Sequence, residues 1–255
     1  MTHKLSVVII AYNEEENIGR CIDSVKEIAD EVLVVDSFST DNTVAVATKK
    51  GARVVQHKFE GHIQQKNWAK ENAAHEYVLS LDADEALSND LKQSLLSLHK
   101  NLDADGYTIN RLNFFCGKPI KTCGWYPDTK LRLWNRTKGE WKGINPHDKF
   151  ELEKRCSIKH LKGDLLHYTY PTRESFLQQR EKFADISAQH LKVERAVFLF
   201  FKMMFSAPFK FIRNYIFKLG FTEGATGLFI CYHQSREVFL KYFRALKLKY
   251  LRVRL

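Results

Sequence analysis

The chain has 255 residues, 44% hydrophobic and 27% charged, a globular composition that excludes a disordered or fibrous protein and allows one sizeable α/β domain with an appendage. Its net charge of +10 is unevenly placed: residues 195–255 hold 12 of the 40 basic residues but only 2 of the 30 acidic ones, so residues 1–194 are neutral. The excess falls in an aromatic segment and indicates an anionic partner.

The first hundred residues alternate between strand and helix patterns. Residues 5–11 are β-branched and almost wholly apolar, as in a strand covered on both faces of a parallel sheet. A helix is predicted next, with Asn13 and Glu16 as its capping box. Its apolar face is formed by Ile18, Cys21, Ile22 and Val25.

Further elements follow at similar spacing. The predicted strands are residues 31–36, 53–57, 77–82 and 106–110. The predicted helices are a segment capped by residues 39–41 and ended by Gly51, residues 63–74, and a segment capped by Ser88. This alternation predicts a doubly wound, mostly parallel sheet, which binds ligands beyond the carboxyl ends of its strands.

Acidic residues stand where two of these strands end. Asp36 closes the second strand, and Asp82 and Asp84 follow the fourth. Alternate residues of an extended segment point to one side, so the last two can direct their carboxylates at one point, a pattern that suits Mg²⁺ or Mn²⁺ beside substrate phosphates. The competing interpretation is a solvated acidic turn that caps the next helix.

Dinucleotide binding is not supported by the sequence. Residues 11–14, Ala-Tyr-Asn-Glu, stand where a Gly-x-Gly-x-x-Gly motif would follow the first strand, and no glycine-rich phosphate loop with Lys-Ser/Thr occurs. A diphosphate would therefore be held by the metal ion and not by a helix N-terminus.

These residues resemble an inverting glycosyltransferase of family 2 with the GT-A fold. The matching segments are residues 6–14, 34–43 and 79–85. Residues 65–67, 124–128, 131–133, 145–148 and 220–227 are similar to bacterial lipopolysaccharide core glycosyltransferases. The resemblance implies a Rossmann-like sheet flanked by helices, a nucleotide-diphospho-sugar donor that is usually a UDP-sugar, and inversion at the anomeric carbon.

Roles for single residues follow from the resemblance. Asp36 matches the aspartate that contacts uracil. The residues implied to bind the nucleotide sugar are Ala11, Tyr12, Glu14, Asp36, Lys66 and Asp82. The implied metal ligands are Asp84 and Asp82, with His167 as a late ligand of the kind that GT-A enzymes often have, although a histidine at a strand end is more often structural.

Two departures from the family pattern concern the nucleotide and the base. The usual Asp-Asp pair is Asp36-Ser37 here, so one carboxylate is missing. The related subgroup has His-Glu where this chain has His147-Asp148, and the aspartate is one methylene shorter. Asp148 is the predicted general base for the acceptor hydroxyl, with His147 orienting the base or the acceptor. The alternative for both is a surface turn.

Further aromatic and basic residues lie between the predicted sheet and this base. Trp125, Trp134 and Trp141 are candidates for a sugar-stacking platform, with core packing as the alternative. Arg111, Lys130 and Arg132 are candidates to contact diphosphate or an anionic acceptor, with a solvated surface position as the alternative.

We expect a catalytic domain over residues 1–194, with a nucleotide-sugar half of about 1–110 and an acceptor half of about 111–194, and a helical tail over 195–255. The tail places Phe198, Phe201, Phe205, Phe209 and Ile212 on one face beside lysines and arginines. Such helices lie on anionic membranes. Packing on the sheet or in a homo-oligomer is the alternative, and no nucleic-acid-binding motif is present.

No secretory signal and no span of about 20 apolar residues is visible, and the five cysteines show no metal-ligand spacing and suggest reduced thiols. We therefore expect an enzyme on the cytoplasmic face of the bacterial inner membrane that glycosylates a lipid-linked glycan such as lipopolysaccharide core. The rivals are transfer to polyprenyl phosphate or to an O-antigen or capsule intermediate, a non-catalytic nucleotide-sugar-binding subunit, and a nucleotidyltransferase.

Overall fold

The computed structural model describes residues 4–98, 102–144, 147–191 and 194–252. The chain forms two compact units, residues 1–112 with 128–168 and residues 113–127 with 169–255. The first unit holds the strand–helix alternation of the sequence. The segment from Thr169 onward, predicted as part of the catalytic domain up to residue 194, belongs by its contacts to the same unit as the tail.

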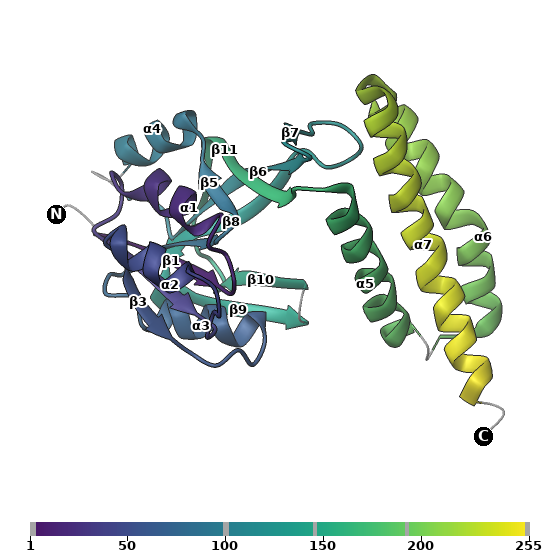
Figure 1. Ribbon diagram of the computed structural model, residues 1–255, viewed down its shortest axis with the longest axis horizontal. Coiled ribbons are helices and arrows are strands. Elements are labelled where there is room, and N and C mark those ends of the chain that lie inside the picture. Colours follow the sequence, from purple (N-terminus) through teal and green to yellow (C-terminus); the bar gives the residue numbers. More distant parts are fainter. Residues whose placement is uncertain (1–3, 99–101, 145–146, 192–193, 253–255) are drawn as a thin grey trace. The chain divides into compact units, whose positions relative to one another are not determined.

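Four parallel strands form the helix-flanked sheet expected from the sequence (Figure 1). They are β1 (Leu5–Ala11), β2 (Glu31–Asp36), β3 (Arg53–Gln56) and β4 (Tyr77–Asp82), in the order β3-β2-β1-β4. Ala11 pairs with Asp36 in the register of β1 and β2. The carboxyl ends of these neighbouring strands therefore share one edge.

The sheet continues beyond β4 with strands of which the sequence predicted only one, over residues 106–110. They are β5 (Glu85–Leu87), β6 (Gly106–Phe115), β8 (Asp128–Asn135) and β11 (Ile158–Tyr170), and β7 (Lys118–Pro119) pairs with β6. The complete order is β3-β2-β1-β4-β8-β6-β11-β5, and β8 is antiparallel to both β4 and β6. A separate hairpin pairs β9 (Gly139–Ile144) with β10 (His147–Leu152).

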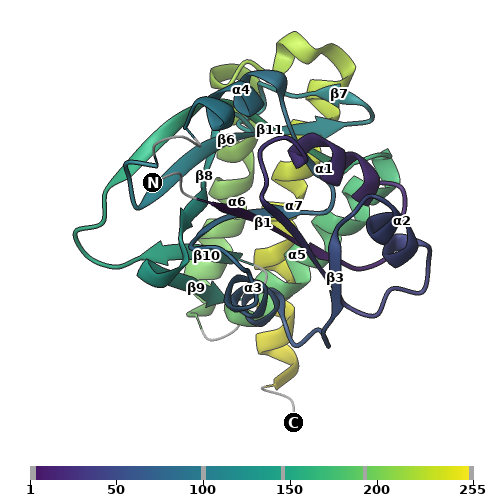
Figure 2. The same cartoon turned by 90° about the vertical axis from the view of Figure 1, so that its left-hand side faces the viewer.

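Helices cover both faces of the parallel strands (Figure 2). They are α1 (Ile18–Val25), α2 (Thr43–Lys49), α3 (His62–Glu71) and α4 (Asn89–Leu98). Alternate residues of β1 belong to opposite cores: Val7 and Ile9 pack with α1, α2 and α4, whereas Val8 packs with α3 and the β9–β10 hairpin. The predicted apolar face of α1 is buried, as expected.

The predicted capping box of α1 is wrong. The helix begins at Ile18, and Asn13 has a positive φ of 54°. The Oδ1 atom of Asn13 instead accepts a hydrogen bond of 2.8 Å from the backbone N–H of Thr40. A short polar side chain tolerates this left-handed conformation, which ends the strand. By contrast, Ser88 does cap α4, because its Oγ accepts from the N–H of Leu91 at 3.2 Å.

The second unit is mainly helical (Figure 1). Its helices are α5 (Arg173–Leu191), α6 (Ala196–Ile212), a π-helical turn (Arg213–Phe217), a 3₁₀ turn (Gly220–Glu223) and α7 (Gly224–Arg252). Both α5 and α6 pack along α7. Arg180 of α5 pairs with Glu237 of α7 at 3.0 Å. Gly227 admits no side chain, because a Cβ there would overlap the carbonyl oxygen of Gly220.

Within the described residues, no helix has the length and apolar character needed to cross a membrane. All five cysteines are free thiols, as the sequence suggests.

Candidate active site

The loops after β1 and β2 are joined by hydrogen bonds. The backbone N–H of Asn13 donates to Oγ of Ser39 at 2.9 Å, and the N–H of Ser39 donates to Oδ2 of Asp36 at 2.9 Å. The N–H of Glu14 donates to Oγ1 of Thr43 at 2.7 Å. Four residues predicted to bind the nucleotide therefore lie at one edge of the sheet: Ala11, Tyr12, Glu14 and Asp36.

These predicted nucleotide-binding residues differ in exposure. The Asp36 side chain is fully buried, and its carboxylate accepts hydrogen bonds from Ser39 and, at 3.3 Å, from Nε2 of Gln56. The Tyr12 side chain is 59% exposed. Burial raises the pKa of Glu14, and the hydrogen bond from Asn17 opposes that rise. Asp36 thus anchors the loop after β2, while Tyr12 offers an open ring to a ligand.

Asp82, at the end of β4, lies between two cations. Its Oδ1 is 3.3 Å from Nζ of Lys66, and its Oδ2 is 3.1 Å from Arg132, which also pairs with Glu85 at 2.6 Å. Burial by itself would raise the pKa of Asp82, but the charges of Lys66 and Arg132 outweigh it and hold that pKa far below the ordinary value.

Glu85 is a functional candidate that the sequence did not single out, and Arg132 is a candidate whose acidic partners it did not identify. The solvated position considered for Arg132 is wrong, since its side chain is only 4% exposed, and Glu85 is fully buried. The signal was present in the sequence: an arginine stands inside the apolar run Leu131–Trp134, and a buried arginine requires acidic partners.

Lys66 also contacts the predicted base. Its Nζ is 2.9 Å from Oδ2 of Asp148 in β10, and the two side chains are only 8% and 7% exposed. The ammonium group lies 4.5 Å from the centre of the Trp141 ring. Residues from α3, β4 and β10 therefore meet at one buried cation. His147 begins β10, but its side chain lies outside the part of the chain that the structure describes.

Asp84 faces a different partner from Asp82. Its Oδ2 is 3.2 Å from Nε2 of His167, with side chains 24% and 12% exposed. The N–H of Tyr168 donates to the backbone oxygen of Asp84 at 3.0 Å, which ties this turn to β11. The two side chains therefore form a partly exposed carboxylate–imidazole pair at the end of the sheet.

The fit of a metal ion to these residues is partial. Among the described residues, no three His, Cys, Asp or Glu side chains form a group that could hold a metal ion by themselves. Mg²⁺ usually binds through one or two protein ligands, with substrate phosphates and water completing its shell. Asp84 supplies one carboxylate of the kind that Mg²⁺ and Mn²⁺ prefer, and His167 supplies an imidazole, a ligand that these ions favour less. Both oxygens of Asp82 already face cations.

The aromatic candidates have a structural role. Trp134 and Trp141 are 0% and 5% exposed, and Trp134 stacks on Phe150 with ring centres 3.9 Å apart. Trp125 packs in the second unit, 5.5 Å from the ring centre of Tyr170. These tryptophans therefore pack in the protein interior, which was the alternative to a sugar-stacking role. Neither Trp134 nor Trp141 offers a ring face to a sugar.

Of the other basic candidates, Arg111 and Lys130 are held by one carboxylate. Asp128 accepts from Arg111 at 2.7 Å and from Lys130 at 2.9 Å. Arg111 also approaches Glu85 at 3.6 Å and so extends the ion network around Asp82.

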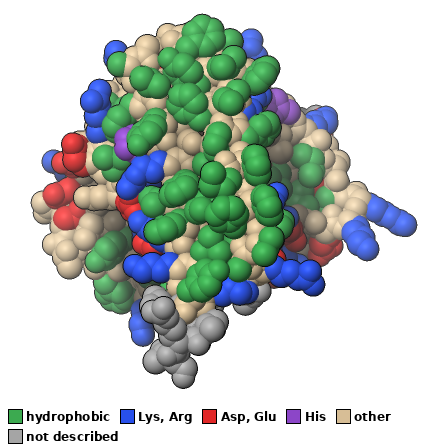
Figure 3. Space-filling model, turned by 90° about the vertical axis from the view of Figure 1, so that its right-hand side faces the viewer, with side chains coloured by type: hydrophobic (Ala, Val, Ile, Leu, Met, Phe, Trp, Pro, Cys, Tyr) green, Lys and Arg blue, Asp and Glu red, His purple; other side chains and the backbone are tan. Residues whose placement is uncertain are grey.

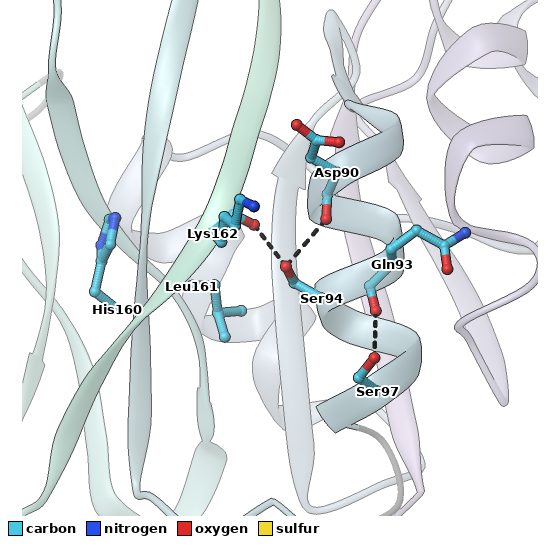
Figure 4. Close-up of a pocket in the computed structure, with 7 residues that line it drawn as sticks. All are labelled: Asp90, Gln93, Ser94, Ser97, His160, Leu161 and Lys162. Carbon is cyan, nitrogen blue, oxygen red and sulfur yellow. Dashed lines mark hydrogen bonds between the residues drawn. The ribbon is translucent and has the colours of Figure 1, made fainter.

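A separate open pocket of about 450 Å³ lies between α4 and β11 (Figure 4). It is lined by Asp90, Gln93, Ser94, Ser97, His160, Leu161 and Lys162. The hydroxyl of Ser94 donates to the backbone oxygens of Asp90 and Lys162, at 3.0 and 2.8 Å. None of the residues discussed above lines this pocket.

Several known proteins similar to this chain are glycosyltransferases. The family model "Glycosyl transferase family 2" matches residues 6–151. An uncharacterized glycosyltransferase of Rickettsia typhi is 30% identical over 265 residues, which cover 96% of this chain and 88% of that protein. One from Rickettsia conorii is 44% identical over 107 residues, covering 42% of this chain but only 38% of its own length.

Two further similarities cover most of this chain. The lipopolysaccharide core biosynthesis glycosyltransferase LpsC of Rhizobium meliloti is 26% identical over 263 residues and 93% of each chain. The crystal structure of S. aureus TarS is 18% identical, covers 74% of this chain and 40% of its own, and superposes with a TM-score of 0.47.

Proposed function

Because the chain belongs to glycosyl transferase family 2 and is thus a glycosyltransferase, we propose that it moves a sugar from a nucleotide-diphospho-sugar to a lipid-linked glycan with inversion at the anomeric carbon. The donor is a UDP-sugar, most simply a UDP-hexose. The observation that carries the proposal is the meeting of Asp82 and Asp148 at the buried ammonium group of Lys66, beside the Asp84–His167 pair.

Donor binding divides between two parts of the first unit. The nucleotide binds at the joined loops after β1 and β2, where the exposed ring of Tyr12 stacks on the base and Glu14 lines the pocket. The diphosphate binds near the end of β4. Its negative charge is matched there by Lys66, because no glycine-rich loop offers backbone N–H groups.

A divalent cation, Mg²⁺ or Mn²⁺, would be held by Asp84 and His167, with Asp82 in the surrounding shell. When bound, such an ion neutralises charge on a departing diphosphate. Asp82 has another role in the protein: it holds Lys66 and Arg132 in place. The two carboxylates of the Asp-x-Asp motif therefore do different work.

Asp148 acts as the general base. As the acceptor oxygen bonds to the anomeric carbon and the bond to the diphosphate breaks, the hydroxyl proton moves to the Asp148 carboxylate. In the structure this carboxylate is paired with Lys66 at 2.9 Å. Donor binding frees it, because the diphosphate is a stronger competitor for the same ammonium group.

The acceptor is a membrane-anchored glycolipid such as lipopolysaccharide core, and the enzyme works on the cytoplasmic face of the bacterial inner membrane. The similarity to LpsC supports this acceptor class. A lipid-borne acceptor also suits the basic, aromatic residues 195–255, which bring the catalytic unit to an anionic membrane surface.

One observation favours a second candidate, transfer to polyprenyl phosphate. A phosphate acceptor is already ionised and needs no general base, and Asp148 is already neutralised by Lys66. The two functions differ in one variant. Asp148→Asn should abolish transfer to a sugar hydroxyl but leave transfer to a phosphate acceptor nearly unchanged.

The test of the proposed function is a donor screen. Purified full-length protein is mixed with a panel of nucleotide sugars and Mn²⁺ or Mg²⁺, and nucleotide release is measured. We expect slow hydrolysis of one donor that is lost with a chelator and in Asp84→Ala. Asp90→Ala, at an exposed carboxylate in the first turn of α4, is the matched control. Metal-independent turnover, or none with any donor and lipid acceptor, would contradict the proposal.

A further inference from the structure

Helix α6 presents large apolar side chains to solvent along its whole length (Figure 3). Those at least 45% exposed are Val197, Phe198, Phe200, Phe201, Met204, Phe205, Phe209 and Ile212. The buried side of the helix consists of Leu199 and Ala207. Helix α6 therefore packs along α7 through one side, which includes Leu199 and Ala207, and leaves its aromatic side uncovered.

The apolar surface continues past α6. The turns that follow expose Ile216, Phe217, Leu219 and Phe221, each at least 50%. Helix α7 adds Leu228, Tyr232, Phe239, Phe243 and Tyr250, which recur at intervals of four and seven residues and so form one stripe. We call the exposed apolar residues of α6, the turns and α7 the aromatic face. A soluble monomer rarely exposes so continuous an apolar surface.

Basic side chains are interspersed with this face. Lys202, Arg213 and Lys218 are exposed, and the ammonium group of Lys202 lies 5.4 Å from the centre of the Phe198 ring. The two acidic residues of segment 195–255 have partners inside the second unit. Glu237 pairs with Arg180 at 3.0 Å, and Glu223 accepts a hydrogen bond from Thr122 at 3.1 Å. The face is therefore apolar and positively charged at once.

We propose that the aromatic face docks on an anionic lipid bilayer, with α6 and α7 lying in the headgroup plane. Charge decides between a bilayer and a second copy of the chain. A two-fold interface would bring the lysines and arginines of both copies together, whereas anionic headgroups complement them. This inference rests on the proposed function in one respect: a lipid-linked acceptor explains why the enzyme would bind a membrane.

Vesicle flotation with the full-length protein tests the docking. The vesicles contain phosphatidylglycerol and phosphatidylethanolamine, or phosphatidylcholine alone. We expect binding to the anionic vesicles that weakens with salt, and little binding to phosphatidylcholine. The triple variant Phe201→Ser/Phe205→Ser/Phe209→Ser should lower the partition coefficient by at least about tenfold, since these rings are 54%, 68% and 65% exposed and contribute little to the fold.

A charge variant and two controls complete the experiment. Lys202→Glu/Lys218→Glu should also weaken binding by at least about tenfold, because two attractive charges become repulsive. Ile158→Ser, at a 54% exposed apolar residue of the first unit, and Lys4→Glu/Lys154→Glu, at exposed lysines of the same unit, should bind like the unchanged protein.

Two results would overturn the proposal. One is equal vesicle binding by the unchanged protein and both face variants. The other is a pair of findings: the unchanged protein sediments as a dimer and does not bind vesicles, and the triple serine variant sediments as a monomer. That result would identify the face as a self-association surface. Nucleotide release from a soluble donor is measured on the same proteins. If binding follows the expected pattern while no donor is hydrolysed, the docking stands and the proposed function fails.

Discussion

Replacing Lys66 with methionine probes the centre of the candidate site. The side chain keeps most of its length and apolar stem but loses the ammonium group that lies 2.9 Å from Asp148 and 3.3 Å from Asp82. Asp82 retains Arg132 at 3.1 Å. The uncompensated charge is therefore mainly that of Asp148, whose side chain is 7% exposed.

The size of the effect follows from the geometry. At 2.9 Å, two unit charges attract by about 6 kcal/mol at an effective dielectric constant of about 20. Desolvation offsets part of this, and removing one partner of a buried pair costs about 3–5 kcal/mol. We expect the low end, about 3 kcal/mol, because the charge of Arg132 also acts on Asp148. For a chain of this length that lowers the Tm by about 6–12 °C.

The assay is thermal unfolding of the full-length protein, carried out as a double-mutant cycle. Asp148→Asn alone should cost less than Lys66→Met, since Lys66 keeps Asp82 as a partner. The double variant should lose about 2 kcal/mol less stability than the sum of the losses in the two single variants. The matched control is Lys142→Met, which breaks the exposed pair with Glu140 and should change stability by at most about 1 kcal/mol.

Two outcomes would refute this reasoning. If Lys66→Met lowers the Tm no more than Lys142→Met, the ion pairs of Lys66 do not hold this part of the first unit together. If the losses from Lys66→Met and Asp148→Asn are additive, the two side chains do not interact. In either case the step in which the donor diphosphate releases Asp148 would have no basis.

Three further variants test other parts of the first unit. His167→Ala should raise the Mn²⁺ concentration that supports half-maximal donor hydrolysis by at least about tenfold, because it removes a proposed ligand; an unchanged metal titration would exclude His167. A hydrogen bond from Lys138, together with one from the backbone of Ser157, lowers the pKa of Asp105 from 3.8 to about 2. The stabilisation that ionised Asp105 contributes is therefore full above about pH 4 and is lost as the pH falls toward 2. Asp105→Asn should consequently lower the Tm at pH 7 and have the same Tm as the unchanged protein near pH 2. Gly163 has a φ of +98°, and a Cβ there would overlap the backbone nitrogen of Leu91, so Gly163→Ala should destabilise the protein by at least about 2 kcal/mol, measured by denaturant unfolding.

Much of the fold could be predicted from the sequence because it depends on short-range patterns. The apolar runs of β1 and β4 and the helical spacing on α1 lie within about ten residues and are dictated by the periods of strand and helix. The carboxylates at strand ends were visible for the same reason. The order of parallel strands then brings those ends to one edge.

The tertiary structure alone decided which charges meet. Lys66 and Asp148 are 82 residues apart in sequence, and Arg132 and Asp82 are 50 apart. No local period relates such pairs. Their contact depends on β8 entering the sheet beside β4 and on the β9–β10 hairpin packing against α3, and both are set by core packing around Trp134 and Trp141. The sequence by itself determined the elements and the chemical groups they carry, while burial, which requires every buried charge to have a partner, determined how those groups are combined.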